Sequence, residues 1–282
     1  MASKDQSDLG NQESTPKLID IAQKGFAQAS NYEKARNDYP LEAVKFLLKQ
    51  LRIFDKTTVQ AKVLELGSGT GKFIRVMLEV LKDQNVRVIA SDPVDQMCEQ
   101  FKRLQPDVDV IQCAAEDIHL PDGSVDVVIA SQSFHWFANQ TALEEIHRVL
   151  APDGRFAIIW SAPDISLPWM AEIWAFVGTL IKENSLITPF DEDWKNVFGL
   201  TPQKLFSDLE ENSSFRLIMP SSFEDCYEYF ASYSVLINST ESRRKSFRKL
   251  FDEIMKKYFI DRGTDLDHFP FNLFMYWCTK IV

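Results

Sequence analysis

The sequence has few residues that bind metal ions, and those it has are scattered. It contains four cysteines and four histidines in 282 residues, with no two cysteines at the spacing of a local zinc site. We therefore expect no metal site and no disulfide framework, and the reducing cytoplasm is the expected compartment. The residues concerned are Cys98, Cys113, Cys226, Cys278, His119, His135, His147 and His268.

Basic residues and long apolar runs are also scarce. The 31 Lys and Arg residues are outnumbered by 41 Asp and Glu, for a net charge of −10. A protein that neutralises nucleic-acid phosphates needs the opposite balance, so we expect no nucleic-acid partner, and the basic run 243–257 is interpreted as a solvated helix face. No apolar run approaches the roughly 20 residues of a membrane span. The first residues lack the apolar segment of a signal peptide, so neither membrane nor secretion is expected.

Aromatic residues, in contrast, are abundant and unevenly distributed. The chain has 34 Phe, Trp and Tyr, and 22 of them follow residue 160. The chain is also longer than the roughly 150–200 residues of a single α/β domain. We expect one domain with a large aromatic-rich addition, or two closely joined units.

The order of apolar segments predicts an α/β fold. Residues 1–16 are polar and are expected to form a mobile tail, and 17–58 are expected to form an N-terminal helical lid. In 59–160, strands alternate with helices, which predicts a mainly parallel sheet covered on both faces. Thr141 and Glu144 are interpreted as a capping box that begins a helix. Residues 161–282 are predicted to form a helical cap with closing strands of the sheet. The predicted strands are 62–66, 86–90, 108–112, 125–130 and 156–160.

A glycine-rich turn follows the first predicted strand, with the sequence Glu65-Leu-Gly-Ser-Gly-Thr-Gly71. Glycines allow a ligand to approach the backbone closely and permit positive φ angles. A dinucleotide-binding turn requires Gly or Ala at position 72, which is Lys72. A phosphate-binding loop requires Ser or Thr after that lysine, where Phe73 stands. The remaining pattern is an acid, one spacer and GxGxG.

This pattern resembles the first motif of class I S-adenosylmethionine-dependent methyltransferases, and further motifs follow in the order of that family. The segment Glu144–Gly154 resembles the E-x-x-R-V-L-x-P-G-G signature of the type 11 group, with Asp153 in place of the first Gly. The resemblance implies a Rossmann-like, doubly wound, mainly parallel seven-stranded sheet and S-adenosylmethionine as cofactor. The cofactor-binding residues that it implies in this part of the chain are Glu65, Gly67, Ser68, Gly69, Gly71, Asp92, Pro93, Met97, Glu116, Asp117, Ile118, Ser131 and Gln132.

Particular roles follow from the same resemblance, each with a structural alternative. Asp92 would accept hydrogen bonds from the ribose hydroxyls, or it caps a helix. Asp117 would accept from the adenine amine, or it is an ordinary loop residue. Met97 would pack on adenine, or it belongs to a helix face.

The segment with Tyr32, Arg36 and Tyr39 resembles a stretch that closes over the cofactor in enzymes similar to trans-aconitate methyltransferase, although Asn37 replaces a proline. The resemblance implies cofactor contacts for Tyr32 and Arg36 and a substrate contact for Tyr39.

The implied function is methyl transfer to a small-molecule acceptor, at an oxygen of a small carboxylic acid or another hydroxyl compound. Nitrogen or carbon methylation, a protein substrate, and a catalytically silent partner protein are the alternatives. His135 is either a general base or a pocket wall. The sequence does not indicate an oligomeric state. The candidate substrate-binding residues are Tyr39, His135, Trp136, Trp160 and Trp169.

Overall fold

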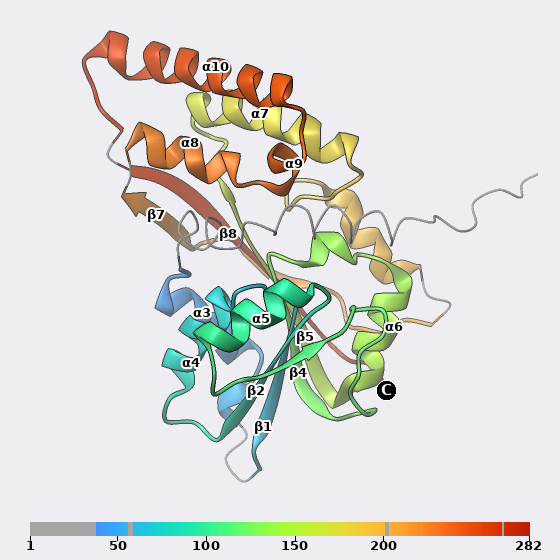
Figure 1. The fold of residues 1–282 in the computed structure, drawn as a ribbon. Coiled ribbons are helices and arrows are strands. Elements are labelled where there is room, and N and C mark those ends of the chain that lie inside the picture. Colours follow the sequence, from blue (N-terminus) through green and yellow to red (C-terminus); the bar gives the residue numbers. More distant parts are fainter. Residues whose placement is uncertain (1–37, 56–58, 201–202, 221, 267) are drawn as a thin grey trace, which may run out of the picture.

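The computed structural model describes residues 38–55, 59–200, 203–220, 222–266 and 268–282. These residues form an eight-stranded sheet in the order β3-β2-β1-β4-β5-β8-β6, with β7 also paired to β8 (Figure 1). The strands β3, β2, β1, β4 and β5 are parallel, and β8 is antiparallel to β5. The strands are β1 (Ala61–Leu66), β2 (Val86–Asp92), β3 (Asp109–Gln112), β4 (Val125–Ser131), β5 (Leu150–Pro163), β6 (Glu210–Asn212), β7 (Arg216–Pro220) and β8 (His268–Thr279).

The predicted number of seven strands is therefore one too low for the described residues. The difference arises in the cap, where β6 has three residues and β7 has five, and both pair with β8 at different positions along it. The mainly parallel α/β sheet itself is confirmed. The helices are α3 (Leu41–Gln50), α4 (Lys72–Leu81), α5 (Asp95–Leu104), α6 (Gln140–Val149), α7 (Pro168–Glu183), α8 (Phe223–Ala231), α9 (Ser234–Ile237) and α10 (Glu241–Tyr258), with 3-10 turns η1 (Ile53–Asp55), η2 (Phe134–Trp136), η3 (Glu192–Gly199) and η4 (Ile260–Arg262).

The two faces of the sheet carry separate apolar clusters, because successive side chains of a strand point to opposite faces. In β1, Val63 belongs to the cluster under α3 and α4, whereas Leu64 belongs to the cluster under α6 and η3. Both residues are fully buried. Helices therefore cover both faces, as the alternation of strands and helices predicts.

The predicted capping box of α6 is wrong. The helix begins at Gln140, and the side chain of Asn139 accepts a hydrogen bond from the backbone N–H of Ala142 at 3.0 Å. Thr141 lies in the first turn with its side chain exposed. Two good capping residues stand two positions apart in the sequence, and the extended backbone at Asn139 (φ −139°, ψ 167°) selects the first of them.

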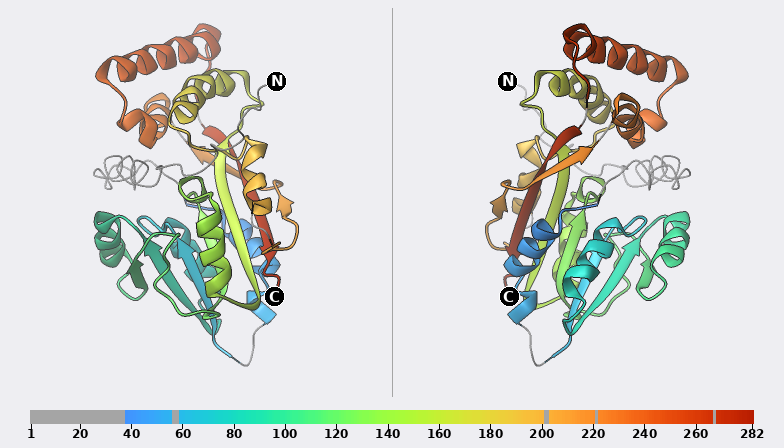
Figure 2. Two further views of the ribbon diagram at one scale, coloured as in Figure 1. Left: turned by 90° about the vertical axis from the view of Figure 1, so that its right-hand side faces the viewer. Right: turned by 90° about the vertical axis from the view of Figure 1, so that its left-hand side faces the viewer.

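The cap lies over the carboxyl edge of the parallel strands (Figure 2). Its helices α7, α8, α9 and α10 enclose an apolar cluster that also includes Phe269 and Phe271 of β8. Further along β8, Leu273 and Met275 belong to the cluster under α3 and α4. A single strand thus contributes to both the cap and the sheet.

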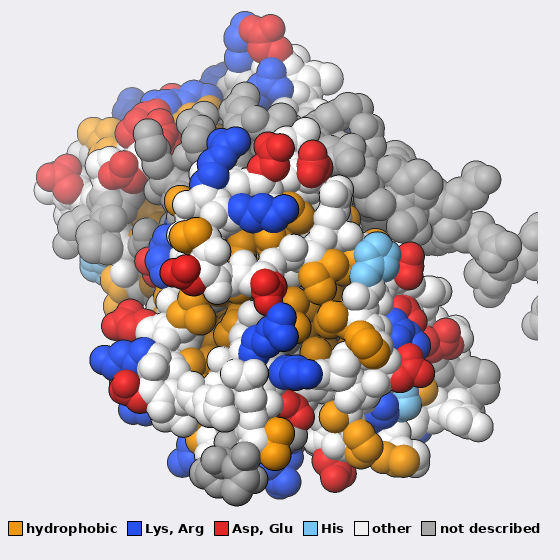
Figure 3. All heavy atoms as spheres, turned by 60° about the horizontal axis from the view of Figure 1, so that its bottom comes forward, with side chains coloured by type: hydrophobic (Ala, Val, Ile, Leu, Met, Phe, Trp, Pro, Cys, Tyr) orange, Lys and Arg blue, Asp and Glu red, His pale blue; other side chains and the backbone are white. Residues whose placement is uncertain are grey.

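The surface visible in Figure 3 carries Lys and Arg side chains interspersed with Asp and Glu. Exposed ion pairs are found elsewhere in the structure as well, for example between Arg87 Nη2 and Asp109 Oδ2 at 2.6 Å. Among the described residues, no helix combines the length and apolar character needed to span a membrane.

Candidate functional site

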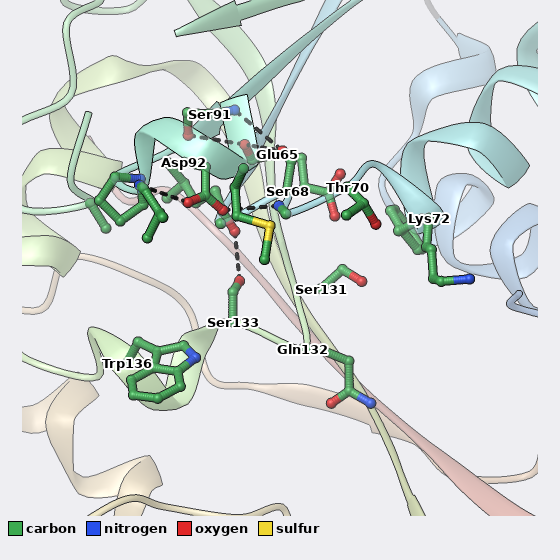
Figure 4. A pocket seen from close by; sticks show the side chains of 18 of the residues that line it. Glu65, Ser68, Thr70, Lys72, Ser91, Asp92, Ser131, Gln132, Ser133 and Trp136 are labelled. Atoms are coloured by element: carbon green, nitrogen blue, oxygen red, sulfur yellow. Dashed lines mark hydrogen bonds between the residues drawn. The ribbon is translucent and has the colours of Figure 1, made fainter. Parts of the chain in front are cut away.

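A cavity of about 160 Å³ opens at the carboxyl edge of β1, β2 and β4 (Figure 4). This is the edge at which open α/β sheets bind ligands, since the loops part there. Its floor is formed by the turns that follow the strands, and its other wall by the cap. The lining from the strand ends includes Glu65, Gly67, Ser68, Gly69, Asp92, Pro93, Met97, Glu116, Ser131 and Gln132, and the lining from the cap comprises Leu217, Met219 and Tyr229.

The glycines of the first turn have distinct roles. Gly67, Gly69 and Gly71 have φ angles of 69°, 54° and 87°. A Cβ atom at Gly67 would lie 2.6 Å from the Cβ of Ser133, and one at Gly71 would lie 2.7 Å from the ring of Phe101. At Gly69, which lines the cavity, an added Cβ would have no neighbour within 4 Å. Gly67 and Gly71 thus allow close packing, whereas Gly69 exposes backbone to the cavity.

Asp92 joins the ends of β1 and β2 through its carboxylate. Oδ2 accepts a hydrogen bond from the N–H of Gly69 at 2.9 Å, and Oδ1 accepts one from the N–H of Val94 at 2.9 Å. Burial raises the pKa of Asp92 to about 6, although these two backbone donors act in the opposite direction. A carboxylate has about four acceptor positions. Asp92 can therefore hold the turn and still accept from hydroxyl groups in the cavity.

Glu65 is a second buried acid in the same wall, and its side chain lies close to Asp92 in Figure 4. The residue is 1% exposed, and Oε2 has no hydrogen-bond partner among the described residues. Burial raises the pKa of Glu65 well above its usual value, and the nearby charge of Asp92 raises it further. A buried charge without a partner is costly. A cation in this cavity would offset that cost by charge attraction, which fits a sulfonium or ammonium group.

The end of β4 forms the opposite wall. The Ser131 hydroxyl donates to the Tyr39 hydroxyl at 2.9 Å, which places Tyr39 at the cavity. Gln132 has a φ of 53°, which is unusual for a residue with a side chain, and its Nε2 donates to the Ser161 carbonyl at 2.8 Å. Such backbone strain clusters at functional sites.

A second cavity, of about 100 Å³, adjoins the first. Gln132, Trp136 and Ser161 line both. His135 and Trp160 line the second cavity and not the first. Its remaining wall comes from the cap, with Trp174, Ile181, Leu186, Ile187, Thr188, Pro189, Ser232, Tyr233, Ser234 and Val235, together with Ala162 of β5.

Four of the predicted site residues line neither cavity. Gly71 packs against Phe101, as described above. The Asp117 side chain is 83% exposed, and its Oδ2 lies 3.5 Å from His119 Nε2. Ile118 is buried in the core, where its N–H donates to Glu145. Trp169 is buried within the cap, in edge contact with Phe259 at 5.5 Å. Tyr32 and Arg36 lie outside the described residues.

Sequence reasoning missed several residues that line the first cavity. Thr70 lies in the quoted glycine turn and Cys113 in the quoted segment after β3, so position alone could have indicated them. In the sequence analysis, Lys72 was used only to exclude a dinucleotide-binding turn, although its side chain lines the cavity. Nothing in the local sequence marks Tyr229, whose approach depends on the fold of the cap. Within the described residues, no three His, Cys, Asp or Glu side chains are grouped for metal binding.

Comparison with known proteins assigns the family. A model described as a methyltransferase domain matches residues 64–158. An uncharacterized methyltransferase of Schizosaccharomyces pombe is 32% identical over 244 residues, which cover 86% of this chain and 91% of the relative. The chain belongs to the methyltransferase family. An uncharacterized methyltransferase of Mycobacterium tuberculosis is 30% identical over 223 residues, covering 74% of this chain and 86% of the relative. This methyltransferase is an enzyme that uses S-adenosylmethionine as its cofactor.

Solved structures agree with the fold of this methyltransferase. A putative type II methyltransferase from Anaeromyxobacter dehalogenans has a TM-score of 0.59 and 22% identity, and the match covers 87% of this chain and 97% of the other. A phosphoethanolamine N-methyltransferase from Haemonchus contortus, in complex with S-adenosyl-L-methionine, has a TM-score of 0.56 and 14% identity, covering 97% of this chain and 61% of the other. Identities this low support the shared fold alone. The resemblance to trans-aconitate methyltransferase stays a prediction.

Proposed function

We propose that the chain transfers a methyl group from S-adenosylmethionine to an oxygen atom of a small-molecule acceptor. The first cavity carries this proposal, because two buried carboxylates, an open glycine backbone and an apolar Met97 meet there. These groups match the ribose hydroxyls, the positive charges and the flat base of the cofactor. The expected compartment is the cytoplasm, and no partner other than the acceptor is proposed.

Individual residues of the first cavity are assigned by what they offer. Asp92 accepts from the ribose hydroxyls with the acceptor positions that Gly69 and Val94 leave open. Glu65 attracts the positive charges of the cofactor, and Met97 packs against adenine. Glu116 lies on this cavity and is held by Asn139, whose Nδ2 donates to its Oε1 at 2.8 Å. We assign the acidic wall beside adenine to Glu116 rather than to the exposed Asp117. Tyr32 and Arg36 stay predictions from resemblance.

When bound, S-adenosylmethionine supplies a methyl group on a positively charged sulfur, and its transfer leaves a neutral thioether. The protein's part is to hold the acceptor atom in line, at about 3–3.5 Å from the reacting carbon. The cap lies over the carboxyl edge of the strands (Figure 2) and contributes residues to the walls of both cavities, which limits the access of water to the reacting groups. His135 lines the second cavity, where it is placed to accept the proton of a hydroxyl acceptor.

Isothermal titration with S-adenosylhomocysteine tests the assigned cofactor site. We expect Asp92→Ala to weaken binding at least tenfold, because the variant loses the hydroxyl acceptor and the bond that holds Gly69. The matched control Asp117→Ala should bind within twofold of the wild type, since its side chain lies outside the cavity. Equal effects of the two substitutions would contradict the assignment. Absence of binding by the wild type at millimolar ligand would contradict the function.

The acceptor class is tested with radiolabelled methyl donor. Activity is measured on a metabolite extract and, separately, on total protein and total RNA. We expect label to enter the metabolite fraction. Label confined to protein or RNA would overturn the small-molecule part of the proposal and leave the cofactor assignment intact.

A further inference from the structure

We propose that the second cavity is the acceptor site and that it selects an uncharged acceptor with a flat, apolar body. The proposal rests on the proposed methyl transfer. It begins from position: Gln132, Trp136 and Ser161 form a wall common to both cavities, at the carboxyl ends of β4 and β5. A molecule in the second cavity therefore lies next to the cofactor cavity and beside His135.

The charges of the two cavities differ sharply. The first cavity is lined by four acidic or basic side chains, namely Glu65, Lys72, Asp92 and Glu116. No Lys, Arg, Asp or Glu lines the second cavity in the part of the chain that the structure describes. Apart from His135, no side chain that can carry a positive charge lines this cavity in the described residues, and moving a carboxylate from water into surroundings with so few cationic partners is costly. The second cavity therefore disfavours carboxylate acceptors.

A carboxylate hydrogen-bonded to the wall of the second cavity strengthens this conclusion. Thr188, which lines the cavity, donates from its hydroxyl and its backbone N–H to Oδ2 of Asp191, at 2.7 and 2.8 Å. The carboxylate of Asp191, which does not itself line the cavity, is thus held beside this wall residue. It repels an anion in the cavity and is neutral toward an uncharged molecule.

Three polar side chains of the wall are engaged within the protein, whereas Nε1 of Trp160 has no hydrogen-bond partner among the described residues. The Gln132 amide donates to Ser161, the Thr188 hydroxyl to Asp191 and the Ser232 hydroxyl to the Tyr229 carbonyl at 2.6 Å. These donors would have to break their bonds to solvate an anion. A neutral ligand requires no such rearrangement.

Aromatic side chains give the cavity its shape. Trp136, Trp160, Trp174 and Tyr233 line it. Trp174 packs edge-on against Tyr233, with ring centroids 6.2 Å apart. Large flat walls favour a ligand that stacks or packs edge-on, which is the usual geometry of aromatic pairs. We therefore infer a neutral aromatic or similarly flat acceptor with a hydroxyl group for His135 to deprotonate. Of the two acceptor classes that the sequence analysis named, this inference selects the hydroxyl compound over the small carboxylic acid.

The experiment uses three probes that differ in charge: 2-naphthol, 2-naphthoate and tricarballylate. Binding is followed by isothermal titration at pH 7.5, with and without S-adenosylhomocysteine. We expect 2-naphthol to bind at least tenfold more tightly than either anion. Comparable or tighter binding of either anion overturns the proposal.

Two variants place the binding in this cavity. Ile187→Arg introduces a cation into the wall, and we expect 2-naphthol affinity to fall at least fivefold while 2-naphthoate affinity rises. Ser234→Arg introduces the cation from another part of the wall and provides a second route if the first variant does not fold. The control is Ile260→Arg, at a cap residue that is 57% exposed and lines neither cavity. The proposal is overturned if Ile187→Arg and Ser234→Arg bind 2-naphthol and 2-naphthoate with the same affinities as the control Ile260→Arg.

Failure of this inference differs from failure of the proposed function. S-adenosylhomocysteine should bind Ile187→Arg within twofold of the wild type, since Ile187 does not line the first cavity. If the wild type binds S-adenosylhomocysteine but prefers anionic probes, the acceptor class is wrong and the methyltransferase site stands. If it does not bind S-adenosylhomocysteine, the cofactor assignment fails, while the titrations without cofactor still decide the charge preference of the cavity.

Discussion

Glu65 and Asp92 form a pair of buried acids in one cavity wall, an arrangement that reduces stability. Burial raises the pKa of Asp92 from 3.8 to about 6, so the folded protein holds this proton more tightly than the unfolded chain. Below pH 3.8 the carboxyl group is protonated in both states and the folded state is at its most stable; the unfolding free energy then falls as the pH rises through 6. At pH 7 the burial of ionised Asp92 lowers the unfolding free energy by roughly 3 kcal/mol. Such a cost is understandable at a site where a ligand carries complementary groups.

The raised pKa of Asp92 predicts how cofactor affinity depends on pH. Ribose hydroxyls donate to the ionised carboxylate, so S-adenosylhomocysteine should bind about tenfold more weakly at pH 5 than at pH 7.5, where Asp92 is ionised. Isothermal titration across this range measures the effect. Asp92→Asn, which does not titrate, should bind more weakly but show a flatter profile. If the affinity of the wild type changes with pH no more than that of Asp92→Asn, the role of Asp92 is refuted. Glu65, the other buried acid with a raised pKa in this wall, would then be the group to test.

Gly71 offers a test of backbone and packing effects at a single residue. Its φ is 87°, and a Cβ would lie 2.7 Å from Phe101. Gly263 has a φ of 67° but open space around it. We expect Gly263→Ala to lower the unfolding free energy by about 1–2 kcal/mol, for the left-handed backbone alone. Gly71→Ala should lower the unfolding free energy by about 1–3 kcal/mol more than Gly263→Ala, because the Phe101 ring must move to make room for the Cβ atom. Urea unfolding measures both, and equal losses would show that the packing around Gly71 yields easily.

How far the sequence predicts the site depends on the residue type. The resemblance to methyltransferase motifs predicted Asp92 and Gly69 as a pair of site residues, and a hydrogen bond joins them at the cavity because the turn after a strand constrains backbone and side chain together. Asp117 and Glu116 are neighbours in a loop, and spacing could not decide which side chain turns toward the cavity. Trp169 is one of many cap aromatics, and only tertiary packing separates it from Trp174.

At the scale of elements, the start of α6 connects local structure with the site. Asn139 caps the helix through its oxygen and holds Glu116 through its nitrogen. Asn139→Ala should therefore lower the unfolding free energy by about 1 kcal/mol or more. Thr141→Ala, at the residue that the sequence favoured as part of the cap, should change it by less than about 0.5 kcal/mol. Thermal or urea unfolding distinguishes them; a larger loss for Thr141→Ala would restore the original interpretation.

The strands of the sheet differ in how well the sequence predicts them. Strands β1, β2 and β4 each have a mostly buried apolar centre, which is typical of parallel strands covered on both faces. Strand β6 consists of Glu210-Glu-Asn212 and has no apolar pattern at all. It exists as a strand because β8 supplies a partner more than sixty residues away. Local periodicity cannot predict pairing of that kind.

For the whole molecule, β8 joins the cap and the sheet into one structure. Phe269 is buried in the cap cluster and Leu273 in the sheet cluster, only four residues apart on the same strand. Unfolding of the cap would therefore free half of β8 and expose the edge of β5, with which β8 pairs from Arg155 to Pro163. We expect the cap and the sheet to unfold together.

Differential scanning calorimetry tests this coupling. The wild type should show one transition whose calorimetric and van't Hoff enthalpies agree. Phe269→Ala and Leu273→Ala should each lower the midpoint of that same transition, by an amount equivalent to about 2–5 kcal/mol. Ile218→Ala, at a β7 residue that is 58% exposed, is the control and should change it little. Two resolved transitions, with Phe269→Ala shifting only one, would contradict the coupling.

The pairing of β5 with β8 also bears on how such enzymes diversify. Pro163 at the end of β5 lies opposite Phe271 of β8, so the segment between these strands begins and ends at adjacent positions, and within it β6 and β7 also pair with β8. The cap is in effect the connecting loop of an antiparallel hairpin. An evolutionary exchange of that loop would need only two neighbouring junctions and would leave Glu65, Asp92 and the glycine turn untouched. Because Leu217, Met219 and Tyr229 of the cap also line the first cavity, such an exchange would keep the motif side of the methyl donor site and change its cap side together with the acceptor cavity.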